Sequence, residues 1–236
     1  MQSVQETSTA PLQKRVLCVV AHPDDEVLGV GGTLSRHAET GGDVYVLILS
    51  EGEDAKVEAP RNDCRVEAAR HAGAIMGTRD VRILDFPDQR LDAVPFIELI
   101  KPIEAAMEEV NPQVVYTHHG GDANTDHQIA FKATYAASRP MSRFGTSVER
   151  FLTFETPSST EQAPQLAPYI FGPTCFVDVE RTWDRKMQAL RCYASEMVGG
   201  IHPRSYEYVE ALARMRAGHA GMRLAEAFVV VRDRVM

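Results

Sequence analysis

The sequence lacks a surplus of positive charge. Its 236 residues include 25 Lys and Arg against 33 Asp and Glu, which gives a net charge of -8. Nucleic acids and anionic membranes attract basic surfaces, so this balance argues against both as partners. It is compatible with a neutral or cationic small molecule as the ligand.

Cysteine pairs and long apolar runs are missing as well. The four cysteines are widely spaced without a C-x-x-C pair, which in a chain of this size predicts reduced thiols in a cytoplasmic protein. The longest uninterrupted apolar run, VLCVVA at residues 16–21, is far shorter than the ~20 residues that cross a membrane. Residues 1–14 are polar and lack the apolar core of a signal peptide. We therefore expect a flexible leader at residues 1–14 and a single domain over residues 15–236.

What the sequence does contain, up to about residue 139, is an alternation of short β-branched runs and segments with helical periodicity. Strands are predicted at residues 15–21, 43–50, 81–86 and 113–119, and helices at residues 27–42, 62–77, 93–110 and 127–138. This alternation predicts a mostly parallel sheet with helices on both faces, a three-layer α/β fold. After residue 139, a Pro- and Ser-rich stretch leads to a strand, a helix over residues 181–197, a second helix and a last strand, which we expect to complete the walls of a cleft.

Two clusters of His and Asp follow the first and the fourth predicted strands. The segment HPDDE (residues 22–26) comes directly after the first strand, and THHGGDANTDH (residues 117–127) covers the end of the fourth strand and the loop behind it. In a parallel sheet, binding and catalytic residues lie beyond the carboxyl ends of the strands, and ligands bind where the strand order reverses. The first and fourth strands can be neighbours at that point, so we expect the two clusters to meet in one site.

The first cluster contains three adjacent carboxylates, which repel one another unless a cation offsets their charge. Zn²⁺ is bound by imidazole nitrogen and carboxylate oxygen, and a catalytic zinc site uses three protein ligands. His22 and Asp25 are three residues apart across a turn that Pro23 stiffens, so both can face one ion. His127, at the start of a predicted helix, is the best candidate for the third ligand.

The remaining carboxylates have roles in the same chemistry. Asp24 is then free to act as general base toward the water that the metal activates, whose pKa falls toward ~7. Glu26 and Asp126 are predicted to orient the imidazole ligands by hydrogen bonds.

Other protein classes share parts of this pattern. A phospho-receiver module also holds Mg²⁺ with an Asp pair after its first strand, and Asp85 could accept its phosphoryl group. No lysine suits the fifth strand, however, and the chain is too long for such a module. The segment GVGGT matches no phosphate-binding loop and predicts close packing of a helix on the sheet instead. Surface or packing roles are expected for four other histidines, His37, His71, His202 and His219.

The motif AHPDDE followed by LGVGGTL resembles the PIG-L/LmbE-type zinc-dependent N-acetylglucosaminyl deacetylases, and DANTDH resembles the second motif of that family. The similarity continues through RVEAARHAGAIMG, DFPDQRLD and KMQALRCYASEM to the closing AEAFVVV, and so covers nearly the whole chain from about Arg15 onward. The resemblance implies a Rossmann-like fold. It also implies hydrolysis of an N-acyl group, usually acetyl, from an amino sugar or a sugar-containing conjugate.

Position by position, the resemblance implies the same zinc ligands and general base as the spacing does, namely His22, Asp25 and His127 with Asp24. Arg65 and Asp88 match positions that lie near the sugar of the substrate in relatives. We therefore expect these two side chains to contact the substrate.

One position departs from the family pattern. Many members have a histidine three residues before the last ligand, where it stabilises the oxyanion, and this chain has Asn124 there. An amide can donate a hydrogen bond to an oxyanion, but it cannot supply a proton to the leaving amine. We therefore expect Asp24 to take and to give the proton. His119 is the rival candidate for the acid, and a histidine that only caps the strand end is an equally good interpretation of it.

The expected function is that of a zinc-dependent hydrolase, with Fe²⁺ or Co²⁺ as substitutes, that removes an N-acetyl group from a small amino-sugar substrate. One alternative is a metal-dependent amidase that acts on a larger N-acyl conjugate, such as a thiol–sugar adduct or an antibiotic precursor. Another is a module that binds a ligand or Mg²⁺ without hydrolysis. The acidic loop at residues 51–61 favours a neutral or cationic saccharide, and the sequence is compatible with a homo-oligomer.

Overall fold

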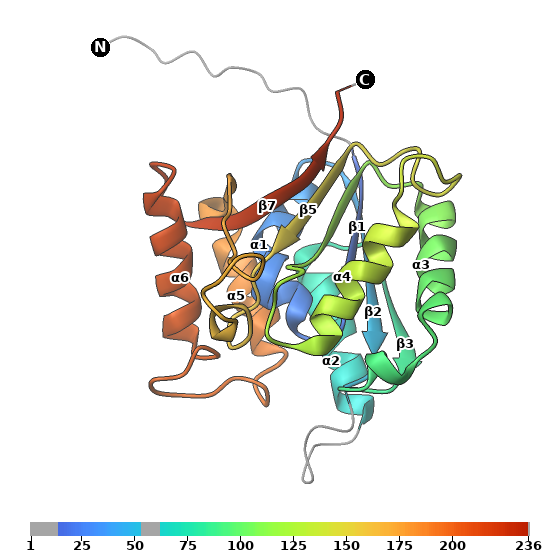
Figure 1. Cartoon of the computed structure of the whole chain (residues 1–236). Helices are drawn as coiled ribbons and strands as arrows, with labels where there is room; N and C mark the ends of the chain where they lie inside the picture. The colour runs from blue at the N-terminus through green and yellow to red at the C-terminus, as the bar shows by residue number, and fades with distance from the viewer. Residues whose placement is uncertain (1–13, 53–61, 236) are drawn as a thin grey trace.

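A seven-stranded sheet with helices on both faces makes up the described part of the chain, residues 14–52 and 62–235 of a computed structural model (Figure 1). The strands are β1 (Arg15–Val20), β2 (Asp43–Ser50), β3 (Asp80–Phe86), β4 (Val114–His118), β5 (Arg150–Phe154), β6 (Cys175–Asp178) and β7 (Ala225–Asp233). The helices are α1 (Asp25–Glu39), α2 (Asn62–Met76), α3 (Phe96–Val110), α4 (Thr125–Ala137), α5 (Trp183–Arg191) and α6 (Tyr206–Gly218).

The strand order is β3-β2-β1-β4-β5-β7-β6. The first five strands are parallel, and β7 runs antiparallel to both of its neighbours, β5 and β6. Val16 in β1 pairs with Val44 in β2 on one side and with Val114 in β4 on the other. The mostly parallel α/β sheet and the neighbouring first and fourth strands are therefore confirmed.

The central strand β1 is buried on both faces, which is why its sequence is a continuous apolar run rather than an alternating one. Val16, Cys18 and Val20 belong to one apolar core, and Leu17 and Val19 belong to the other. Side chains of α1, α2, α5 and α6 fill the first core, and those of α3 and α4 fill the second. The predicted three layers are thus present.

The C-terminal part differs from the sequence prediction in two places. β5 is not among the predicted strands, since it has only five residues, includes Arg150 and Thr153, and follows a loop rather than a helix. The helix predicted over residues 181–197 ends at Arg191 in the structure. Just beyond that end, Tyr193 is buried and donates its hydroxyl to Glu26.

Residues 1–13 of the predicted leader and residues 53–61 of the acidic loop lie outside the described residues, and the division into a leader and one domain stays a prediction. The two strands that the sequence predicts for the C-terminal part, β6 and β7, belong to the same sheet as β1 to β5. In the part of the chain that is described, no helix combines the length and the apolar character that a membrane crossing requires.

The glycines of GVGGT allow α1 to pack closely on its neighbours, as the sequence predicts. A Cβ atom on Gly29 would overlap the ring of Phe154 in β5, and one on Gly32 would lie 2.9 Å from Val179. Neither position has room for a side chain. The helix that carries the first His/Asp cluster is therefore held directly against the strands beneath it.

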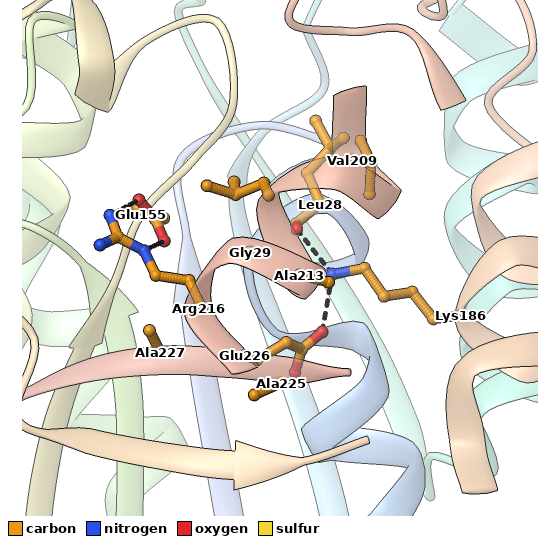
Figure 2. Close-up of a pocket in the computed structure, with 11 residues that line it drawn as sticks. Leu28, Gly29, Glu155, Lys186, Val209, Ala213, Arg216, Ala225, Glu226 and Ala227 are labelled. Carbon is orange, nitrogen blue, oxygen red and sulfur yellow. Dashed lines mark hydrogen bonds and ion pairs between the residues drawn. The ribbon is translucent and has the colours of Figure 1, made fainter. Parts of the chain in front are cut away.

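A buried ion pair fastens the same helix to α5 and β7 (Figure 2). Lys186 Nζ lies 2.7 Å from Glu226 Oε1 and donates a second hydrogen bond to the carbonyl oxygen of Leu28. The Glu226 carboxylate also accepts the backbone N–H groups of Gly32 and Thr33, at 2.8 and 2.7 Å. Because both charges are buried, removing either one would leave the other without its partner.

We expect Lys186→Met to lower the free energy of unfolding by about 3–5 kcal/mol, because it leaves the buried Glu226 carboxylate without its cation. The matched control is Lys101→Met, whose exposed ammonium pairs with Glu98 and whose loss should cost less than about 1 kcal/mol. Urea denaturation of both variants measures the difference. Equal and small effects of the two substitutions would contradict this role of the pair.

Candidate metal centre

The two His/Asp clusters meet at the carboxyl edge of the sheet. The turn after β1 carries His22 and leads into α1, which begins at Asp25, and the loop after β4 leads into α4, whose first turn carries His127. Because β1 and β4 are adjacent and parallel, both connections leave the sheet at the same edge. The structure therefore brings the two clusters together in one site, as expected.

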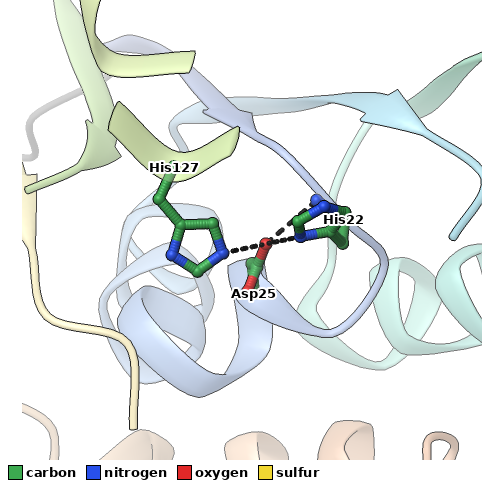
Figure 3. A group of neighbouring side chains, drawn as sticks. All are labelled: His22, Asp25 and His127. Carbon is green, nitrogen blue, oxygen red and sulfur yellow. Dashed lines mark hydrogen bonds and ion pairs between the residues drawn. The ribbon is translucent and has the colours of Figure 1, made fainter. Parts of the chain in front are cut away.

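The carboxylate of Asp25 lies between two imidazole rings (Figure 3). Its Oδ2 atom is 3.4 Å from His22 Nδ1 and 3.4 Å from His127 Nε2. The same oxygen accepts the backbone N–H of His22 at 2.9 Å, which fixes the carboxylate in the turn. The candidate ligand atoms of the three residues all lie within 4.8 Å of one another.

This donor set fits a divalent metal ion. Ligand atoms at about 2.0–2.2 Å from a tetrahedral Zn²⁺ lie about 3.3–3.6 Å from one another, and both measured distances to Asp25 Oδ2 fall in that range. The second oxygen, Asp25 Oδ1, is buried and has no hydrogen-bond partner among the described residues. Two imidazoles with one carboxylate are also the mixture of nitrogen and oxygen that zinc accepts.

The imidazole nitrogens that face away from Asp25 contact other carboxylates. His22 Nε2 lies 3.1 Å from Asp126 Oδ2, as predicted, and 3.1 Å from Asp88 Oδ1. His22, Asp88 and Asp126 form a second group with ligand atoms within 4.8 Å. We interpret that group as the partners that orient His22, because a metal-binding histidine donates its other N–H to a carboxylate and Asp126 Oδ1 already accepts Leu91 N–H.

Asp122, rather than the predicted Glu26, is the carboxylate at the other imidazole. Its Oδ1 lies 3.2 Å from His127 Nδ1, and the hydroxyls of Ser159 and Thr160 donate to the same carboxylate. Sequence reasoning missed Asp122, and its place in the loop just before His127 is the one signal that could have found it.

Glu26 does not orient an imidazole. Its Oε1 accepts the hydroxyl of Tyr193 at 2.7 Å, and its Oε2 accepts the backbone N–H of Asp24 at 3.1 Å. The side chain therefore supports the turn that carries Asp24. The reason is its place in the first turn of α1, which turns it toward the C-terminal part of the chain.

Of the two adjacent histidines at the end of β4, His118 is the one at the centre. Its ring stacks on His127 with centroids 3.9 Å apart, and its Nε2 lies 3.4 Å from Asp25 Oδ2. That nitrogen accepts the backbone N–H of Ala21 at 3.0 Å, so its lone pair is already used and His118 packs the site without joining the ligand set. The predicted His119 instead places Nε2 3.1 Å from the carbonyl oxygen of Tyr169.

Burial and charge act against each other on the ionisable groups of the centre. Burial alone would lower the pKa of His127, but the carboxylates of Asp25 and Asp122 raise it to about 9. Burial likewise would raise the pKa of Asp122, but His127 and the two hydroxyls lower it to about 2. The buried carboxylates thus draw positive charge into the centre, as a metal site requires.

A cavity of about 430 Å³ opens beside the centre. Five of the predicted site residues line it, namely His22, Asp24, Arg65, Asp88 and Asn124. Further lining residues that the sequence analysis does not identify are Gln89, Ser158, Glu196, Val198 and Arg204. His202 also lines the cavity but belongs to neither candidate ligand group, and His119 is not among the lining residues.

Asp24 is held firmly at the edge of this cavity. It precedes α1 with a positive φ of 105°, which is uncommon for a residue other than glycine. Its Oδ2 accepts a hydrogen bond from Arg204 Nη1 at 2.7 Å. Burial raises the pKa of Asp24 to about 6, and the Arg204 guanidinium acts in the opposite direction.

Arg65 and Asn124 each make hydrogen bonds or ion pairs with other residues of the protein. The guanidinium of Arg65 donates to the Gly52 carbonyl and lies 2.9 Å from Glu196 Oε1. Asn124 is the N-cap residue of α4, and its Oδ1 accepts Asp126 N–H at 2.8 Å. This leaves the amide NH₂ group as the part of Asn124 that can donate to a ligand in the cavity.

The family model described as GlcNAc-PI de-N-acetylase (PIG-L) matches residues 17–138, which run from β1 through α4. The chain is 26% identical to a diacetylchitobiose deacetylase of Thermococcus kodakarensis, over 90% of this chain and 81% of that protein. It is 29% identical to a 4-oxalmesaconate hydratase of Pseudomonas putida, over 78% of this chain and 74% of that protein.

The fold is also similar to that of solved structures. The N,N'-diacetylchitobiose deacetylase of Pyrococcus horikoshii superimposes with a TM-score of 0.76 and 18% sequence identity, covering 92% of this chain and 84% of that one. At this identity the likeness concerns the fold alone. Deacetylases and a hydratase are thus both similar to this chain, and the reaction has to be argued from the site itself.

We expect His127→Ala to abolish high-affinity zinc binding, because the variant keeps only two of the three ligand atoms around Asp25. The matched control is His119→Ala, which removes a histidine of the same loop that contacts the Tyr169 carbonyl. Zinc content after dialysis, measured by atomic absorption, should fall only in the first variant. Equal zinc content in the two variants would exclude His127 as a ligand.

Proposed function

This chain belongs to the GlcNAc-PI de-N-acetylase (PIG-L) family, and on that basis we propose that it is a zinc-dependent hydrolase of an N-acetylated amino sugar or sugar-containing conjugate. The products are acetate and a free amine. The observation that carries the proposal is that His22, Asp25 and His127 come together beside Asp24 at one polar cavity. Fe²⁺ and Co²⁺ are accepted by the same kinds of ligand atoms and can substitute for zinc.

The metal and the protein divide the chemistry between them. His22, Asp25 and His127 would hold Zn²⁺, which when bound would supply a Lewis acid for the acetamide carbonyl and lower the pKa of water toward ~7. Asp24 accepts the proton of the attacking water while the new C–O bond forms at the carbonyl carbon. When the C–N bond breaks, the same carboxyl group gives its proton to the departing nitrogen, which leaves as the free amine.

Asn124 is the residue that we assign to the developing oxyanion. It lines the cavity, and the cap at Asp126 N–H uses only its carbonyl oxygen, so the NH₂ group is available as the donor. His119 is the weaker candidate for either role, since its ring nitrogen contacts the Tyr169 carbonyl. Asp24 is therefore proposed to act as both base and acid.

A neutral, hydroxyl-rich substrate suits the rest of the cavity. Both guanidinium groups in the lining are already paired with carboxylates, Arg65 with Glu196 and Arg204 with Asp24. Little positive charge is left to offset a phosphate or carboxylate on the ligand. Asp88 and the other polar side chains of the lining offer the hydrogen bonds that sugar hydroxyls need.

The test is acetate release from a panel of N-acetylated amino sugars by chelator-treated protein, with and without added Zn²⁺. We expect release that is lost on chelation and returns with zinc. If the zinc-loaded protein releases no acetate from any N-acetylated saccharide, the proposed deacetylation is wrong. Hydration of an unsaturated dicarboxylate by the same preparation would then identify the hydratase reaction instead.

Asp24→Asn is the control that ties the released acetate to this cavity. Because an asparagine side chain keeps the shape of aspartate but cannot accept a proton, we expect kcat to fall by about 10²–10⁴ with zinc content unchanged. Full activity of this variant would show that another group serves as the base.

Asn124→Ser separates the two functions of Asn124. Serine can still cap α4, so the fold should be kept, but it lacks the amide donor, and we expect kcat to fall by about 10²–10³. Steady-state kinetics and a thermal melt measure the two effects. If His119→Ala loses turnover and Asn124→Ser does not, the oxyanion donor is His119.

A further inference from the structure

Asp24 is held in place by side chains from the C-terminal third of the chain. Arg204 Nη1 donates to Asp24 Oδ2 at 2.7 Å. The backbone N–H of Asp24 donates to Glu26, whose carboxylate in turn accepts the Tyr193 hydroxyl at 2.7 Å. Tyr193 and Arg204 both lie beyond residue 138, where the family match ends. Asp24 lies within the matched region, but the Arg204 and Tyr193 side chains that hold it lie outside that region.

The arrangement of Arg204 is that of a fixed support. Its Nε donates to the Ser158 hydroxyl at 2.9 Å while Nη1 donates to Asp24. Its backbone N–H donates to His202 Nδ1 at 3.0 Å, and its carbonyl accepts the N–H of Val198 at 3.1 Å. Two hydrogen bonds hold the planar guanidinium, and two more hold the backbone of Arg204. The side chain therefore has little freedom to turn.

The contact also distinguishes the two oxygens of the Asp24 carboxylate. Oδ2 accepts from Arg204, whereas Oδ1 accepts no hydrogen bond within the described part of the chain. A general base must lie within hydrogen-bond reach of the proton that it removes, and small misplacements of such groups are costly in rate. A fixed Oδ2 leaves one defined oxygen, Oδ1, to meet the water.

We infer that Arg204 is a positioning residue for the general base. Its guanidinium bridges Ser158 and Asp24 and so aims the Asp24 carboxylate at the reacting water. Arg204 itself exchanges no proton in this role. The inference rests on the proposed hydrolysis. It adds that a residue beyond the end of the family match positions the general base.

The experiment compares Arg204→Ala and Arg204→Lys with the wild type on the best substrate of the panel. We expect Arg204→Ala to lower kcat by about 10²-fold, with KM within about threefold of the wild type and zinc content unchanged. Lysine can reach Asp24 but cannot reproduce the planar fork, so Arg204→Lys should fall between the two. Added guanidinium ion, below concentrations that unfold the protein, should restore part of kcat in Arg204→Ala.

Arg214→Ala is the matched control. Arg214 is exposed on α6 and pairs with Glu210, so its removal should leave kcat unchanged and unresponsive to guanidinium. Ser158→Ala removes only the second anchor of Arg204 and should lower kcat less than Arg204→Ala does.

Four results would overturn the inference. A raised KM with unchanged kcat in Arg204→Ala would make Arg204 a substrate contact, and loss of zinc would make it a support of the metal centre. Wild-type kcat in Arg204→Lys would show that a nearby cation suffices without the planar guanidinium. If Arg204→Ala does not fold, Arg204→Lys and Ser158→Ala decide the question. A wild-type enzyme that releases no acetate contradicts the proposed function, whereas an active wild type with an equally active Arg204→Ala contradicts only the positioning role.

Discussion

The parallel pairing of β1 with β4 is the constraint on which the candidate site depends. β1 ends at Val20 and β4 at His118, and because the two strands are neighbours that run in one direction, the segments after them leave the sheet together. Asp25 from the first segment thereby reaches His127 from the second. Inserting one more strand between them would separate the carboxylate from this imidazole by about another 4.8 Å.

Three adjacent carboxylates are tolerated at one buried turn because each has a different partner. Asp24 accepts from Arg204, Asp25 faces two imidazoles, and Glu26 accepts the hydroxyl of Tyr193. Burial raises the pKa of Glu26 to about 8, while the hydrogen bond from Tyr193 acts in the opposite direction and favours the charged carboxylate. The divalent cation of the proposed function would offset what charge is left.

The relatives show that this fold supports more than one reaction, since deacetylases and a hydratase are both similar to the chain. In the proposed function, the turn after β1 supplies His22 and Asp25 as metal ligands and Asp24 as the base. The walls of the cavity combine residues that precede α4, such as Arg65 and Asp88, with later ones, such as Ser158, Glu196 and Arg204.

The sequence by itself determined the α/β sheet and the grouping of His22, Asp25 and His127. Strand periodicity and the three-residue spacing of His22 and Asp25 are local properties that can be seen in the sequence. Both motifs follow parallel strands, so they lie at the same edge of the sheet. Only the tertiary structure decided which partners those residues have. Arg204 and Asp24 are 180 residues apart, and no local pattern relates them. His118 is the last residue of β4 and stacks on His127, whereas His119 follows the strand and contacts Tyr169, and two adjacent histidines in a sequence give no sign of this difference. Such contacts depend on the order of the strands and the direction of the side chains, and both are set only when the chain folds.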